Sequence, residues 1–286
     1  MGILLSFGVA LLESVKDAVG KVATRRTSPV SLLLLYKGTA LLLLSPLLLW
    51  RGIHADLNTF IPVAVLNASL NALAFYLYLR AISLSPLSAT VPVLSFSPVF
   101  LLITSRVMLG QEVPPPGAAG VILVAVGSYI LNLREARGGL LRPLTAILRE
   151  SGPRYMLVVS LVWSITANLD RVGVEASDPF LWVATMDAGI VVATLPFALD
   201  ALRRCRPSLT HPLAMGVADA VGSVLQMLAI TLTLVPYVIA IKRTSTLLSS
   251  LVGVLLFREG RGRERLAGAT VMFLGASLIL LSLFGR

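Results

Sequence analysis

The sequence of 286 residues contains little charge and almost no cysteine or histidine. Only 13% of its residues are charged, against about 25% in an average soluble domain. The single cysteine, Cys205, excludes an intramolecular disulfide. The two histidines, His54 and His211, are not spaced with other ligands as a metal site requires. These shortages exclude a soluble protein and predict an integral membrane protein without a metal or other cofactor.

Catalytic motifs are also missing from the sequence. There is no nucleophile elbow and no glycine-rich loop that would cradle a phosphate. Asp187 and Asp219 faintly resemble the paired aspartates of intramembrane proteases, but Met186 and Ala218 stand where that motif has tyrosine and glycine. We therefore predict that the protein is not an enzyme.

The hydrophobic residues, 56% of the chain, fall into long segments. About 20 apolar residues span a bilayer as a helix, and none of the segments has the ~10-residue alternation of a membrane barrel. The segments are 2–21, 29–50, 59–82, 88–109, 115–132, 154–172, 179–200, 212–233, 235–257 and 266–284. The sequence thus predicts an all-α integral membrane protein with ten transmembrane helices.

The two halves of the chain resemble each other. The aligned pairs, at offsets of 150 and then 148 residues, include Pro29 with Pro179, Pro46 with Pro196, Gly120 with Gly268 and Gly127 with Gly275. We predict a first five-helix repeat over 1–133, a cytoplasmic linker over 134–153 and a second five-helix repeat over 154–286. An odd number of helices per repeat inverts the second copy in the membrane. Inverted repeats are typical of transporters that work by alternating access.

Basic residues are concentrated on one side of this topology. Of the 24 Lys and Arg residues, sixteen lie in or beside the loops after the first, third, fifth, seventh and ninth helices. Cytoplasmic loops carry an excess of Lys and Arg, so we expect a multi-pass protein of the cell inner (plasma) membrane with both termini outside. These loops also explain the net charge of +10 without a nucleic-acid partner.

The predicted helix over 235–257 contains two cations, Lys242 and Arg243. A charge near the bilayer centre costs about 3 kcal/mol, so such a residue faces a protein interior or a wet cavity. On a continuous helix, Lys242, Thr246 and Ser249 share one polar stripe. We predict that these three residues and Arg243 bind substrate. The alternative is a buried pair held by acidic partners on neighbouring helices.

Other polar groups lie inside the predicted spans. Further candidates for substrate binding are Lys16, Lys37, Asn71 and Asp219, and the candidates for proton coupling are Glu13, Asp187 and Asp219. The alternative is that Lys37 with Asp187, and Lys16 with Glu13 and Asp17, form neutral internal pairs that hold helices together. We expect this of at least half of these residues.

The combination of features resembles a known family. Ten helices in two repeats, a fourth helix with Pro92 and Pro98, and Glu112 and Glu259 after equivalent helices resemble the drug/metabolite transporter superfamily, in its EamA-type branch. The resemblance implies a secondary transporter whose central cavity is lined by helices 1–4 and 6–9, with helices 5 and 10 at the periphery.

One motif within this superfamily is more specific. Lys242-Arg243 is similar to the ninth-helix Lys-Arg pair of plastid sugar-phosphate translocators, which grips the substrate phosphate. That similarity implies that both residues are anion ligands. The segment Thr244-Ser245-Thr246 departs from the translocator pattern, which has an aliphatic stretch there.

We predict a secondary active transporter that moves a small polar metabolite with an anionic group across the membrane by alternating access. The metabolite would be an amino acid, an organic acid or a phosphate ester. The alternatives are a flippase for a lipid-linked head group, a multidrug exporter and, more remotely, a structural membrane protein without transport. The expected partners are the lipid bilayer and a small-molecule substrate, and the expected state is a monomer or homodimer.

Overall fold

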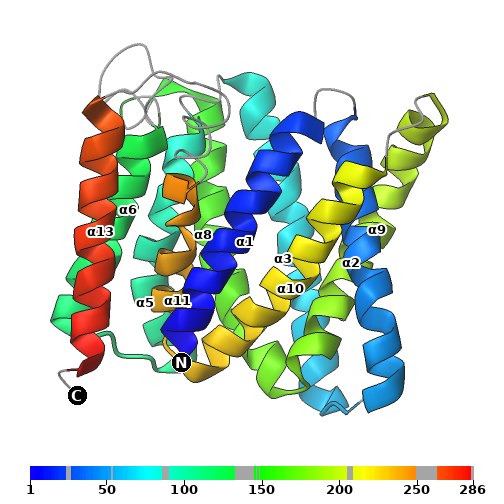
Figure 1. Cartoon of the computed structure of the whole chain (residues 1–286), viewed down its shortest axis with the longest axis horizontal. Helices are drawn as coiled ribbons and strands as arrows, with labels where there is room; N and C mark the ends of the chain where they lie inside the picture. Colours follow the sequence, from blue (N-terminus) through cyan, green and yellow to red (C-terminus); the bar gives the residue numbers. More distant parts are fainter. Residues whose placement is uncertain are drawn as a thin grey trace. The chain divides into compact units, whose positions relative to one another are not determined.

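The computed structural model describes residues 1–23, 27–52, 54–85, 90–132, 145, 147, 149–204, 209–248 and 263–284. Each predicted hydrophobic segment coincides with a helix in this part of the chain (Figure 1). The all-α fold is therefore confirmed. Ser249 and the rest of the predicted ninth span lie outside the described residues.

The helices begin and end close to the predicted bounds. They are α1 (Gly2–Ala23), α2 (Pro29–Arg51), α3 (Leu57–Leu84), the 3₁₀ helix η1 (Val91–Phe96), α5 (Ser97–Leu109), α6 (Pro115–Asn132), α8 (Ser151–Glu175), α9 (Pro179–Arg204), α10 (Thr210–Leu232), α11 (Val235–Lys242) and α13 (Arg263–Phe284). Six spans among the described helices are long and apolar enough to cross a membrane, and α6 and α13 add shorter apolar stretches.

Two equivalent helices of the predicted repeats begin in the same way. The Ser28 hydroxyl accepts a hydrogen bond from the backbone N–H of Ser31 at 3.2 Å, and the Asp178 carboxylate accepts one from the N–H of Phe180 at 2.8 Å. Proline follows at once in both helices, where its missing N–H has no intrahelical partner to lose. The local sequence thus fixes the starts of α2 and α9 independently of the rest of the fold.

The helices form two compact units, and each unit draws on both halves of the sequence. Unit 1 comprises 1–69 and 170–232, and unit 2 comprises 70–169 and 233–286. The boundary between the units falls within α3 and within α8. The predicted division into sequence repeats and a linker is a different division and stays a prediction.

In unit 1, α1 packs along α10, and α2 packs against both α9 and α10. Ala23, Leu32 and Met215 form a small buried cluster between α1, α2 and α10. Gly216 brings α10 close to α2, because a Cβ atom at this glycine would lie 2.8 Å from the Tyr36 carbonyl oxygen. These contacts bring the polar side chains of α1, α2, α9 and α10 together.

In unit 2, α6 packs along α13, and α5 packs against α6 and α11. The core between α3 and α8 contains Ala74 and Ala81 on one side and Met156 and Val159 on the other. Within the two units, α2 contacts α9, α5 contacts α11, and α6 contacts α13. Each of these is a pair of helices at equivalent places in the predicted repeats, as expected if a two-fold axis relates the halves.

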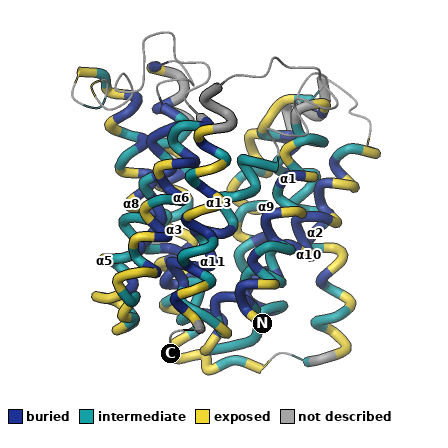
Figure 2. The backbone as a smooth tube through the Cα atoms, turned by 60° about the vertical axis from the view of Figure 1, so that its left-hand side comes forward, coloured by how far each residue is buried: buried dark blue, intermediate teal, exposed yellow. Residues whose placement is uncertain are grey.

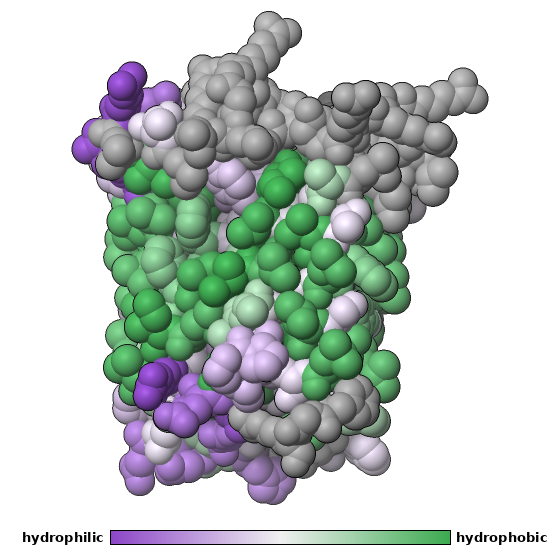
Figure 3. All heavy atoms as spheres, turned by 90° about the vertical axis from the view of Figure 1, so that its left-hand side faces the viewer, coloured by the Kyte–Doolittle hydropathy of each residue, from purple (hydrophilic) through white to green (hydrophobic). Residues whose placement is uncertain are grey.

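Large apolar side chains cover the outside of both units. Examples are Leu49 (86% exposed) and Phe197 (74%) in unit 1, and Val107 (79%) and Phe273 (70%) in unit 2. Figure 2 shows buried and exposed stretches along each helix, and Figure 3 shows hydrophobic residues across the middle of the visible face with hydrophilic residues below. So much exposed apolar surface requires a bilayer around it.

Glycines bring α6 and α13 into direct contact. A Cβ atom on Gly120 would lie 2.7 Å from the Gly275 carbonyl oxygen, and one on Gly275 would lie 2.7 Å from the Gly120 carbonyl oxygen. Gly127 and Gly268 face each other in the same manner. The two helices therefore touch through their backbones, as small residues permit in membranes.

Gly120→Ala should lower the unfolding midpoint of the purified protein, because the new methyl group meets backbone atoms that cannot rotate away. Overpacking of this kind costs about 1–3 kcal/mol. The control is Gly189→Ala in α9, where nothing lies within 4 Å of the added Cβ and alanine favours the helix. Equal midpoints for the two variants would contradict the backbone contact.

Candidate functional site

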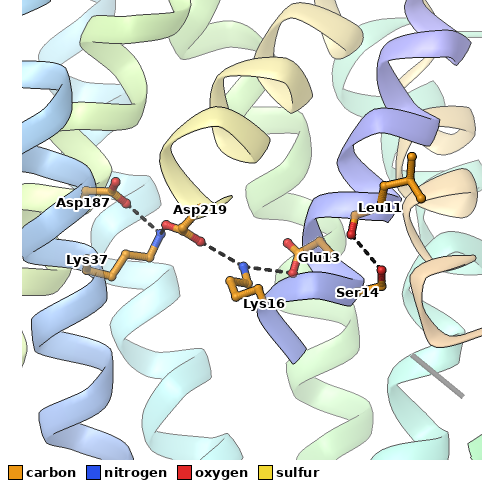
Figure 4. Close-up of polar contacts among 7 residues, drawn as sticks. All are labelled: Leu11, Glu13, Ser14, Lys16, Lys37, Asp187 and Asp219. Atoms are coloured by element: carbon orange, nitrogen blue, oxygen red, sulfur yellow. Dashed lines mark hydrogen bonds and ion pairs between the residues drawn. The ribbon is translucent and has the colours of Figure 1, made fainter. Parts of the chain in front are cut away.

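Five charged side chains form one chain of ion pairs inside unit 1 (Figure 4). Lys37 Nζ lies 2.7 Å from Asp187 Oδ1 and 2.6 Å from Asp219 Oδ2. Lys16 Nζ lies 2.9 Å from Asp219 Oδ1 and 2.9 Å from Glu13 Oε2. We call the series Asp187–Lys37–Asp219–Lys16–Glu13 the ion-pair chain. It joins α9, α2, α10 and α1.

The ion-pair chain is more buried at one end than at the other. The side chains of Asp187 and Asp219 are 3% exposed, that of Lys37 is 13% exposed, and those of Lys16 and Glu13 are 18% and 20% exposed. Asp219 is the centre of the chain, since each of its oxygens accepts a hydrogen bond from a different lysine. A carboxylate in this position is neutralised from two helices at once.

An aromatic ring lies close to both lysines. The centroid of the Tyr36 ring is 5.9 Å from Lys16 Nζ and 5.8 Å from Lys37 Nζ. A cation within about 6 Å of an aromatic centroid is attracted to the ring. The ring of Tyr36, on α2, therefore attracts both lysines of the ion-pair chain.

A small pocket between α1 and α10 adjoins the exposed end of the ion-pair chain. Glu13 and Lys16 line one wall, and Asp219 and Ser223 line the other. The space in this pocket is about that of a single water molecule, far smaller than a site for a small organic ligand. In this conformation the pocket has room for water beside the charges and not for a whole metabolite.

The second polar region lies in unit 2, where α11 ends at Lys242. The next residues form tight turns: the N–H of Thr244 donates to the Ile241 carbonyl at 2.9 Å, and the N–H of Thr246 donates to the Arg243 carbonyl at 3.1 Å. The Thr244 hydroxyl also donates to the Ile241 carbonyl, at 2.7 Å. A threonine side chain that binds nearby backbone in this way competes with the helix.

The continuous polar stripe expected from Lys242 to Thr246 is therefore wrong. The helix is interrupted at Arg243 and Thr244, so the regular spacing on which the stripe depends is lost. The equivalent segment of the first half also departs from plain α-helix, because Val91–Phe96 is a 3₁₀ helix. Pro92 and Pro98 at the starts of η1 and α5 account for that deviation.

One hydrogen bond joins the interrupted segment after α11 to the junction of η1 with α5. Arg243 Nη2 donates to Ser97 Oγ at 2.8 Å, and Ser97 stands at the junction of η1 with α5. Ser97 is 2% exposed and Arg243 is half-buried. The side chain of Gln111, just beyond α5, accepts a hydrogen bond from the N–H of Val235 at 3.0 Å and so caps α11. Side chains thus tie α5 to α11 at two places.

Comparison with known proteins identifies the first half of the chain. Residues 1–133 match the EamA-like transporter family. A solved crystal structure of a protein superposes with a TM-score of 0.81, covering 98% of this chain and 97% of that chain at 16% identity. At this identity the similarity shows the fold alone. No curated protein matches the chain significantly.

The predicted resemblance to EamA-type transporters is confirmed, and the finer similarity to sugar-phosphate translocators is not. The match over residues 1–133, just under half of the chain, supports a multi-pass membrane transporter of the drug/metabolite type, which would contact the bilayer and a small-molecule substrate. Family members of this type are transporters and not enzymes.

The structure of the EamA-like protein places the predicted site residues in two groups. Lys16, Lys37, Asp219, Glu13 and Asp187 all belong to the ion-pair chain. The predicted pairing of Lys37 with Asp187 is present. The predicted pairing of Lys16 with Glu13 is also present, and Lys16 has the unforeseen partner Asp219.

The remaining candidates lie in unit 2. Lys242 and Thr246 flank the break in α11 and are half-buried, as is Asn71 on α3. Ser249 lies outside the described residues. Arg243, also a predicted ligand, donates the hydrogen bond to Ser97 of α5.

Sequence reasoning missed a polar network around Asp170 of α8. Asp170 Oδ1 accepts hydrogen bonds from Asn67 Nδ2 at 2.7 Å and from Trp182 Nε1 at 3.0 Å. The sequence suggests an interfacial position for Asp170, near the end of its span. The signal that would have found it is the position of Asn67 inside the predicted span 59–82, because an amide within the membrane requires a polar partner.

Asp219→Asn should strongly destabilise the protein, because it leaves two buried lysines short of negative charge. Removing one partner of a buried ion pair costs about 3–5 kcal/mol. The control is Glu112→Gln, whose pair with Arg106 is 3.4 Å long and 77% exposed on the glutamate side; exposed pairs contribute at most about 1 kcal/mol. Thermal unfolding of both variants in detergent measures the difference. A similar, small loss in both would refute the importance of the ion-pair chain.

Proposed function

We propose that this EamA-like protein is a secondary active transporter of a small polar metabolite that carries an anionic group. The observation that supports it best is the meeting of two interrupted helices, with Arg243 hydrogen-bonded to Ser97. Interrupted helices with unwound backbone form the substrate sites of many transporters with inverted repeats. Alternating access would expose this region to each side of the membrane in turn.

The chemistry of this region suits an anion. Arg243 carries a guanidinium that can bind a carboxylate or phosphate through two parallel hydrogen bonds. Ser97 begins α5, a helix of 13 residues, and the N-terminus of a helix attracts negative charge. Lys242, the preceding residue, adds a second cation that needs no fixed geometry.

Lys16 and Lys37 are weaker candidates for holding the anion in this conformation. Each ammonium group lies within 2.9 Å of two carboxylate oxygens. An incoming anion would have to displace one of these carboxylates. We propose Arg243, Lys242 and Thr246 as the principal ligands, because they lie together at the interrupted backbone.

A ligand panel on the purified protein tests this proposal. Phosphate esters, amino acids, dicarboxylates and cationic drugs are each added before thermal unfolding, because a bound ligand raises stability by RT ln(1 + [L]/Kd), about 2.7 kcal/mol at a hundredfold excess over Kd. An anionic or zwitterionic compound should stabilise the parent protein and not Arg243→Ala. The matched control is Arg106→Ala, an exposed arginine of α5.

Counterflow into proteoliposomes then measures transport of the stabilising compound. Arg243→Ala should raise its KM about tenfold or more, because a charge-assisted hydrogen bond is lost, while Arg106→Ala should leave KM unchanged. Arg243→Lys should retain part of the affinity through its charge. Stabilisation by cations alone, or equal KM values for Arg243→Ala and the parent, would overturn the proposal.

A further inference from the structure

One buried oxygen of the ion-pair chain has no hydrogen-bond partner among the described residues. It is Asp187 Oδ2, on a residue that is 2% exposed. The other oxygen, Oδ1, accepts from Lys37. We propose that Asp187 binds one exchangeable proton at Oδ2.

The first argument is the charge of the ion-pair chain. It contains three carboxylates, those of Glu13, Asp187 and Asp219, and two ammonium groups, those of Lys16 and Lys37. At its buried end, Asp187 and Asp219 share the ammonium group of Lys37, and Asp219 has Lys16 as well. A carboxylate inside a membrane protein that has to share its one cation is expensive, and one proton bound to Asp187 removes that charge.

The second argument locates the proton on Asp187. Both oxygens of Asp219 accept hydrogen bonds from lysines. The Glu13 side chain is 20% exposed beside the pocket and can bind water. Only Asp187 combines deep burial with an oxygen that lacks a donor. A neutral carboxyl group in that position costs less than an anionic oxygen without a donor.

The third argument concerns the neighbours of Asp187 on each packed helix. The charged groups nearest to it are Lys37 from α2, Asp219 from α10 and Lys16 beyond it from α1. On the other side of α9, Trp182 binds Asp170 of α8 and Met186 contacts Asn67 of α3. These neighbours supply one direct cation to Asp187, and Asp219 shares that cation.

Proton binding would change a contact between helices. A proton from a hydronium ion forms an O–H bond at Asp187 Oδ2, which releases a water molecule and breaks no bond in the protein. Lys37 is then attracted to a neutral group on α9 and a carboxylate on α10, so the link between α2 and α9 weakens. At the other end of the ion-pair chain, Lys16 and Glu13 are its most exposed members and line the water-sized pocket.

Infrared spectroscopy of protein labelled with ¹³C at the aspartate side-chain carboxyl carbon tests the proposal directly. At neutral pH the parent protein should show the C=O band of one protonated aspartate, which shifts in D₂O. The band should be absent from Asp187→Asn. It should be retained in the control Asp170→Asn, which changes the aspartate of α8 that accepts a hydrogen bond from Trp182. No such band in the parent, or its persistence in Asp187→Asn, would overturn the proposal.

A pH titration of the parent protein keeps the test decisive if Asp187→Asn does not fold. The band should disappear with the release of one proton per molecule while the protein stays folded. If the band disappears only when the protein unfolds, the proposal that this proton is exchangeable is wrong. This reading does not require a substrate, so it succeeds or fails independently of the proposed anion site.

Coupling of this proton to transport rests on the proposed function. In proteoliposomes, a pH gradient should accelerate net uptake by the parent protein. Asp187→Asn should retain counterflow exchange and lose that acceleration. Equal acceleration in both would contradict coupling through Asp187, even if the infrared band is present.

Discussion

The ion-pair chain is the interaction on which unit 1 depends. Charges in a low-dielectric interior must be paired, and here two lysines and three carboxylates come from four helices, α1, α2, α9 and α10. The five residues come from four helices, so all of the ion pairs form only when the four helices have assembled. A buried ion pair adds little net stability, but a broken one is costly, and this asymmetry favours one arrangement of the helices.

Unit 2 is built on different contacts. α6 and α13 touch through glycine backbones, while α5 and α11 meet where each segment departs from regular α-helix. The first pair packs closely because glycines let the two backbones meet. The second pair carries polar groups at interrupted backbone, as at many transporter sites. Unit 2 thus combines one pair of helices in backbone contact with another joined by polar side chains.

Much of this fold could be predicted from sequence, because long apolar segments and repeated prolines and glycines are local signals. The pairing of Lys37 with Asp187 was accessible because the two residues occupy equivalent places in the repeats. The position of Asp219 between two lysines was not accessible, since it depends on how α10 packs against α1 and α2. The interruption of α11 was missed for another reason: the Thr244 hydroxyl binds the Ile241 carbonyl, which hydrophobic patterning does not reveal.

The central claim is that charge pairing between helices holds unit 1 together. A double-mutant cycle on Lys37 and Asp219 tests it most directly, with unfolding free energies measured for Lys37→Met, Asp219→Leu, the double variant and the parent. The account predicts a coupling energy of about 1–3 kcal/mol, as for residues in one buried network, with the double variant more stable than Asp219→Leu alone. Additive losses, with a coupling energy near zero, would contradict it.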